Sequence, residues 1–140
     1  LHLDRYMPAT PIRVLLEING KELTKVLKHT QLNSLREHLK RSSRFAIVKK
    51  IKPQLEKLIQ QSESIAMERA LPLVEAAREE MERELGEELE RLRYLKTKNN
   101  TVRDSEIAFF ESRITQANDY FAHATPELQA IRVIVNTYQP

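Results

Sequence analysis

The sequence contains no cysteine and only two glycines, Gly20 and Gly86, among its 140 residues. Without cysteine, the chain cannot form disulfides or thiolate metal sites. A phosphate-binding loop needs several glycines before a helix, so a Walker A loop and a dinucleotide-binding fingerprint are both excluded. We therefore expect the chain to hold no nucleotide and no other cofactor.

Long apolar runs are also missing, since none reaches the roughly 18 residues that suggest a membrane-spanning helix. The chain begins LHLDRYMPATP, with neither an initiator Met nor a basic stretch followed by an apolar one. We expect a fragment of a longer protein with no membrane partner. Its 41% hydrophobic and 31% charged residues are typical of a chain rich in surface helix.

The strongest pattern lies in Leu71–Leu95, which is dense in Glu, Arg, Leu and Ala, all strong helix formers. Spacings of three and four place Met81, Leu85, Leu89, Leu92 and Leu95 on one helical stripe. A second stripe consists of Ile107, Phe110, Ile114, Ala117, Phe121, Ala124, Leu128, Ile131 and Val135. With Lys98–Thr101 as the turn, the two stripes predict an antiparallel helical hairpin.

Counting outward from that turn predicts a register. The facing pairs are Leu95 with Ile107, Leu92 with Phe110, Leu89 with Ile114, and Met81 with Phe121.

The second arm is expected to begin at Thr101 with Asp104 three residues later, a variant of the capping box. Asp104 and Glu106 would then complement the helix dipole and have no catalytic role. Thr125-Pro126 predicts either a kinked helix or a restart, because the apolar stripe continues to Val135. The segment IRVIVNTYQ, 131–139, could be helix or strand.

The N-terminal part predicts an extended lead-in through Pro11 and then a β-hairpin. Ile12–Ile18 is rich in branched apolar residues, and Asn19-Gly20 suits a two-residue turn. Lys21–Lys28 would return as the second strand. The alternative is one strand followed by an early helix.

Two further helices are expected before the hairpin. Thr30–Arg41 forms the first, with Thr30 as its N-cap, and Ser42-Ser43 separates it from a helix that opens near Arg44. Pro53 and Pro72 lie inside helical patterns, where each either kinks a helix or starts a new one. Because the apolar stripe keeps its phase across Pro53, a kink is favoured at both.

The fold class predicted is therefore mainly α (α+β): a long antiparallel helical hairpin, additional helices and a small N-terminal β-hairpin. We expect a single accessory domain over 1–140. Residues 1–30 would form the lead-in and β-hairpin, 31–70 the basic helices and 71–140 the helical hairpin.

Charge is divided unevenly along the chain. Residues 21–57 carry eleven Lys or Arg against three Glu, whereas residues 63–93 carry ten Glu against five Arg. The basic half could contact nucleic-acid phosphates or an acidic protein surface. A solvated helix face is the favoured interpretation, on the ground that no aromatic residues interleave with the basic ones. The candidate contact residues are Lys25, Lys28, Arg36, Lys40, Arg41, Arg44, Lys49, Lys50 and Lys52.

No catalytic or metal-binding arrangement is predicted. The glutamates of the long helix stand at ion-pair spacings from arginines. The pairs expected are Glu79–Arg83, Glu87–Arg91, Glu75–Arg78 and Glu88–Arg91. The histidines, none at a metal-ligand spacing, are His2, His29, His38 and His123.

Three segments resemble the C-terminal region of the RapA family of bacterial RNA polymerase-associated proteins, and they occur in the family's order. GEELERLRYL, 86–95, followed by an Asn turn and VRDSEI, 102–107, resembles the family's GEELERLRAL-like helix and IRDDEL-like helix start. IRVIVNTYQ, 131–139, is similar to its LRLIVVTHQ-like end. RYMPATPIRVLLEING, 5–20, is similar to its FLPRTPLRLLLDKNG-type entry.

The resemblance implies a parent protein that is a Swi/Snf-type, helicase-like ATPase, which binds RNA polymerase and recycles it after transcription in the bacterial cytoplasm. ATP and duplex nucleic acid would bind two RecA-like lobes upstream of Leu1. No catalytic residue of the family maps onto this chain. Its C-terminal region would be an accessory element that packs near the ATPase lobes or contacts polymerase.

The leading hypothesis is a non-catalytic interaction or regulatory domain of such a recycling factor, with RNA polymerase or its own ATPase lobes as partner. The alternative is a basic, nucleic-acid-binding accessory module. A third possibility is a coiled-coil dimeriser, which would follow if the two stripes pair between chains.

Overall fold

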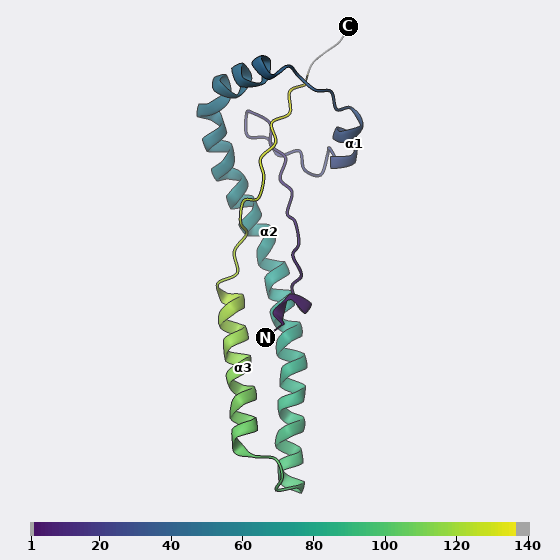
Figure 1. Cartoon of the computed structure of the whole chain (residues 1–140), viewed down its shortest axis with the longest axis vertical. Coiled ribbons are helices and arrows are strands. Elements are labelled where there is room, and N and C mark those ends of the chain that lie inside the picture. The colour runs from purple at the N-terminus through teal and green to yellow at the C-terminus, as the bar shows by residue number, and fades with distance from the viewer. Residues whose placement is uncertain (1, 137–140) are drawn as a thin grey trace. The chain divides into compact units, whose positions relative to one another are not determined.

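The computed structural model describes residues 2–136 of the chain. Its elements are the 3-10 helix η1 (Leu3–Arg5) and the α-helices α1 (His29–Ser34), α2 (Arg41–Lys98) and α3 (Asp104–Ala122), labelled in Figure 1 where there is room. The fold is mainly α, as predicted. The chain divides into two compact units: Leu1–Pro11 with Glu68–Thr125, and Ile12–Met67 with Pro126–Pro140.

The predicted helical hairpin is present in the first unit. There α3 runs antiparallel beside the C-terminal half of α2, the green and teal helices of Figure 1. Met81 and Phe121 are 0% and 1% exposed, and Ala77, Ala117 and Leu3 are buried with them. The two alanines have small side chains, so the helices can approach closely around the large Met and Phe groups.

The predicted register agrees with the contacts across the hairpin. Met81 and Phe121, one of the facing pairs, belong to the same buried cluster. Nearer the turn, Arg93 pairs with Glu111 at 2.7 Å, and Lys96 pairs with Asp104. Each of these partners lies two residues from the position that the register places opposite, a separation that long charged side chains bridge easily.

Helix α2 is continuous from Arg41 to Lys98, so neither Pro53 nor Pro72 starts a new helix. The predicted break at Ser42-Ser43 is wrong, because both serines lie in the first turn of α2. In Figure 1 the helix changes direction in its blue N-terminal part. A proline inside a helix removes one backbone hydrogen bond and crowds the preceding turn, which is the ordinary cause of such bends.

Helix α1 is shorter than the expected Thr30–Arg41 and starts earlier. Lys28, not Thr30, is its N-cap, and the Lys28 N–H donates to Gln31 Oε1 at 2.9 Å. The helix ends at Ser34, whose hydroxyl donates to the Gln31 carbonyl at 2.8 Å. Leu35 is 81% exposed, so the apolar contacts needed to extend a short helix are missing here.

The predicted β-hairpin is wrong, although the chain does reverse where expected. Leu16 and Glu22 form one isolated bridge, and residues 2–136 contain no strand. The turn has three residues, because the Glu17 N–H donates to the Lys21 carbonyl at 2.8 Å and only Gly20 adopts positive φ, at 90°.

Pairing stops soon after that bridge, because the chain turns again at Leu23. The Leu23 carbonyl accepts the N–H groups of Val26 and Leu27 at 3.0 and 2.9 Å. Thr24 Oγ1 accepts the Leu15 N–H at 2.9 Å, where a continuing strand would offer a carbonyl. The alternative expectation, one strand followed by an early helix, therefore fails as well.

The second arm of the hairpin begins later than predicted, and it ends earlier. Arg103 replaces Thr101 as the N-cap of α3, and its N–H donates to Glu106 Oε1 at 3.4 Å. The helix ends at Ala122, so the expected helical continuation through Pro126 is wrong. A residue before proline is disfavoured in helical geometry, and residues 124–136 are neither helix nor strand. The rest of the ambiguous segment, 137–139, lies outside the described residues.

Candidate functional site

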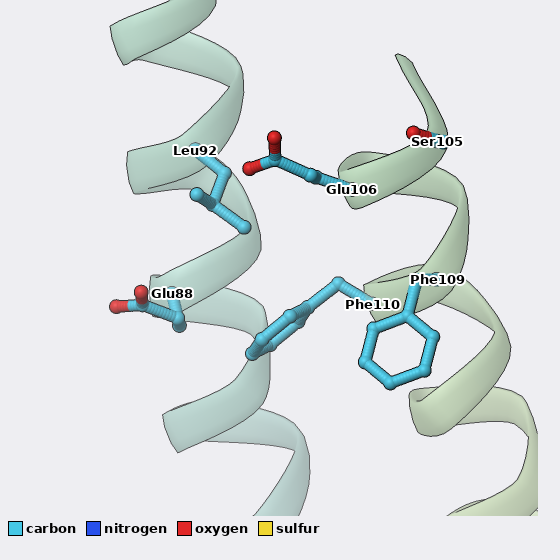
Figure 2. A pocket seen from close by; sticks show the side chains of 6 residues that line it. All are labelled: Glu88, Leu92, Ser105, Glu106, Phe109 and Phe110. Carbon is cyan, nitrogen blue, oxygen red and sulfur yellow. The ribbon is translucent and has the colours of Figure 1, made fainter. Parts of the chain in front are cut away.

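An open groove of about 460 Å³ lies on the first unit between α2 and α3. Figure 2 shows the ring of Phe110 pointing from α3 toward α2, beside Glu88 and below Leu92. Phe109 lies beside it and remains 61% exposed. The Arg113 guanidinium stacks on the Phe109 ring at 5.5 Å. The groove thus has an apolar floor and an exposed aromatic ring at its edge.

The carboxylates at the rim of this groove are already engaged. Glu88 pairs with Arg91, and Glu106 accepts the Arg103 N–H at the start of α3. Glu106 and Asp104 lie in the first turn of α3, where carboxylates favour the positive end of the helix dipole. These groups therefore stabilise the hairpin, and the groove offers a contact surface more than a reactive centre.

The N-terminal segment packs on the same hairpin. Leu3 joins the buried cluster, the Tyr6 hydroxyl donates to Glu84 at 2.9 Å, and Arg5 forms an ion pair with the same carboxylate. A smaller cavity of about 210 Å³ lies between this segment and the helices, with Leu85 among its lining residues. Segments about 80 residues apart in sequence therefore form one structure.

The acidic stretch of α2 is covered by ion pairs, as predicted, but two of the four partners differ. Glu75–Arg78, at 2.5 Å, and Glu88–Arg91 form as expected. Arg83 pairs with Glu80 and Glu87, at 2.6 and 3.3 Å, in place of Glu79. Arg91 pairs with Glu88 and Glu87 pairs with Arg83, so the predicted Glu87–Arg91 contact is replaced too.

These pairs shift the pKa values of their members so that both stay charged. A hydrogen bond from Arg83 lowers the pKa of the Glu80 carboxyl, and one from Arg91 lowers the pKa of Glu88. The same bonds raise the pKa of Arg83 and Arg91. A general acid or base needs a pKa near the working pH, and these shifts move the carboxyl groups away from it.

The nine basic residues predicted as contacts are all exposed, and none of them forms an ion pair within the part of the chain that the structure describes. Five lie at the N-terminal end of α2, with Lys40 immediately before it. The Arg36 guanidinium lies 3.3 Å from the His38 ring. Lys25 and Lys28 lie further back, in the turn before α1 and at its N-cap.

The histidines lie apart from one another in the chain, and His29, His38 and His123 have local partners. His29 is bonded to Asn33 at 3.0 Å, and His123 caps α3 through Nδ1 to the Asp119 carbonyl oxygen at 2.8 Å. Across residues 2–136, no group of three or more His, Asp or Glu side chains could hold a metal ion. Over the same range, no helix is long and apolar enough to cross a membrane.

The sequence did not predict the groove or the packing of the N-terminal segment on the hairpin. The adjacent phenylalanines at 109–110 were a usable signal, since only one of two neighbouring residues can face the partner helix. Nothing in the sequence indicated that Arg5 and Tyr6 would converge on Glu84.

The fold defines this protein as a mainly α-helical domain built on an antiparallel hairpin, with an apolar groove and a separate basic helix end. The family model described as "RNA polymerase recycling family C-terminal" matches residues 1–136. The chain belongs to this family, as its C-terminal domain.

Curated relatives agree along almost the whole chain. The RNA polymerase-associated protein RapA of Klebsiella pneumoniae is 37% identical over 139 residues, and that of Proteus mirabilis is 33% identical over 139 residues. Each alignment covers 99% of this chain and 14% of the relative. The chain therefore spans about one seventh of the proteins it resembles.

Proposed function

We propose that this chain is a non-catalytic interaction domain of an ATP-dependent RNA polymerase recycling factor. Its partner is RNA polymerase or the ATPase lobes of its own parent protein. The observation that carries the proposal is the family match over residues 1–136, which places the chain in the C-terminal part of proteins named RNA polymerase-associated. The bacterial cytoplasm, where polymerase acts, is the compartment that this role predicts.

The electrostatics of the first unit support a structural role for its carboxylates. Glu80 and Glu88 have lowered pKa values because each accepts a hydrogen bond from an arginine, so each stays ionised at neutral pH. A carboxylate held in this way does not exchange protons with a substrate near pH 7. ATP hydrolysis would belong to the remainder of the parent protein.

The groove on the hairpin is the surface that best fits a protein partner. Phe109 is an exposed aromatic ring beside an apolar wall, and such rings are typical anchors of protein interfaces. The hairpin beneath it is fixed by the buried cluster around Met81 and Phe121, so the ring is presented from rigid elements.

Two measurements test the proposal. The purified chain should show no ATP hydrolysis above a buffer blank, and sustained turnover by the chain alone would overturn its non-catalytic part. Phe109→Glu should weaken capture of the partner by roughly tenfold if the ring is an anchor. Lys50→Glu on the second unit is the control that should leave this capture unchanged.

A further inference from the structure

The N-terminal end of α2 carries an exposed face that the hairpin does not explain. Arg41, Arg44, Lys49 and Lys52 are exposed there, and none pairs with a carboxylate among the described residues. The first turn of α2 contains no acidic residue. Within residues 2–136, the positive charge of this segment is therefore not neutralised by ion pairs, in contrast to the charge of Arg83.

Helical geometry places these four cations on one side. At about 100° per residue, Arg41, Arg44, Lys49 and Lys52 fall within an arc of about 140°. Lys50 falls on the opposite side, about 180° from Arg41. Lys50 therefore has the same side chain as Lys49, its neighbour in the sequence, but lies outside the basic face.

Two apolar side chains lie on the same arc. Phe45 is 64% exposed and Val48 is 42% exposed. The Arg41 guanidinium stacks on the Phe45 ring at 5.6 Å. An aromatic ring does therefore interleave with the basic residues, contrary to the expectation that favoured a solvated helix face.

We propose that this face, formed by Arg41, Arg44, Phe45, Val48, Lys49 and Lys52, binds single-stranded nucleic acid. Unpaired Lys and Arg side chains contact successive phosphates, and the exposed ring of Phe45 stacks on a base. A guanidinium already stacked on that ring adds a cationic partner for the same base.

Two features of the face favour this ligand over the alternatives. A duplex offers phosphates along its backbone but no open base face for the Phe45 ring, whereas an unpaired strand offers both. An acidic protein surface is the other candidate. Protein interfaces are depleted in Lys, however, and this face carries Lys49 and Lys52 among its few residues.

The test is fluorescence anisotropy of a labelled oligouridylate mixed with the full chain. We expect binding at low salt that weakens steeply as salt rises toward about 0.2 M. Arg44→Glu with Lys49→Glu should weaken binding at least roughly tenfold, and Phe45→Ala should weaken it by a similar factor. Circular dichroism of each variant verifies that the helices remain folded.

Matched controls separate this face from charge in general. Lys50→Glu makes the same charge change as Lys49→Glu on the opposite side of the helix, and Phe109→Ala removes an exposed ring from the first unit. Near 0.15 M salt, where the Debye length is about 8 Å, both should change the affinity by less than about twofold.

Several outcomes would overturn the proposal. These are no binding of the oligouridylate at low salt, equal losses from Lys49→Glu and Lys50→Glu, or an unchanged affinity after Phe45→Ala. Equal competition by polyglutamate would assign the face to acidic proteins instead. Because none of these measurements involves polymerase, they fail or succeed independently of the interaction role proposed above.

Discussion

Arg93 of α2 donates a hydrogen bond to Glu111 of α3 at 2.7 Å, which links the two arms of the hairpin near its turn. Both side chains are about half exposed, so the pair is accessible to solvent and salt. In a double-mutant cycle with Arg93→Ala and Glu111→Ala, we expect a coupling free energy of about 0.2–1 kcal/mol. The coupling should fall in about 1 M salt. A coupling of zero at low salt would mean that the arms do not meet in this register.

The buried cluster supplies much more stability than this pair. Phe121→Ala should lower the free energy of unfolding by about 3–5 kcal/mol, because the ring is 1% exposed and its removal leaves a cavity. Phe109→Ala on the same helix should change it by less than about 0.5 kcal/mol, since that ring is 61% exposed. Urea denaturation measures both, and equal effects would contradict the assigned face of α3.

The hairpin was the part of the fold that sequence could predict. Its apolar stripes repeat at three and four residues over many turns, so burial determines which side chains face inward, and Met81 and Phe121 meet as expected. Prediction failed for the N-terminal β-hairpin, where only a few contacts determine the local structure. Pairing around Leu16 and Glu22 stops after one bridge because Thr24 takes a backbone bond, and periodicity cannot reveal such a competition.

The site was predicted less well, for a related reason. The stripe pattern indicates which residues could be buried but not how far a partner surface extends, so it does not reveal that Phe45 is exposed. Contacts between distant segments, such as Tyr6 with Glu84, depend on the folded arrangement and leave no periodic signal.

The two glycines should respond to alanine in opposite directions. Gly20 has a φ of +90°, and an added Cβ would lie 3.1 Å from Gln61 Oε1, so Gly20→Ala should destabilise the protein by about 1–2 kcal/mol. Gly86 lies inside α2 with nothing within 4 Å of an added Cβ, so Gly86→Ala should stabilise it by about 0.5–1 kcal/mol. Thermal unfolding of the two variants tests the pair, and the same sign for both would be contrary to this structure.

Acid should weaken the helical hairpin through its glutamates. The pKa of Glu80 and Glu88 is lowered from 4.5 in the folded protein, so the unfolded chain binds protons more readily. Their contribution to stability is therefore complete above about pH 4.5 and is lost as the pH falls through the folded-state pKa. Unfolding free energies measured from neutral to acidic pH should show this loss.

Glutamine variants identify the groups responsible for that pH dependence. Replacing Glu80 and Glu88 with Gln removes both titrations, so the decline in stability on acidification should become shallower. Glu79→Gln is the matched control, because Arg83 pairs with Glu80 and Glu87 and not with Glu79. An equally shallow profile for this control would show that the lowered pKa values do not depend on those arginine bonds.

A capture assay decides whether this chain is an interaction domain of a polymerase-recycling factor. The immobilised chain is exposed separately to purified bacterial core RNA polymerase and to the ATPase lobes of a family member. At least one of them should be retained by the wild-type chain, and Phe109→Glu should weaken its retention by roughly tenfold. Retention of neither by the folded wild-type chain would contradict the proposed interaction role.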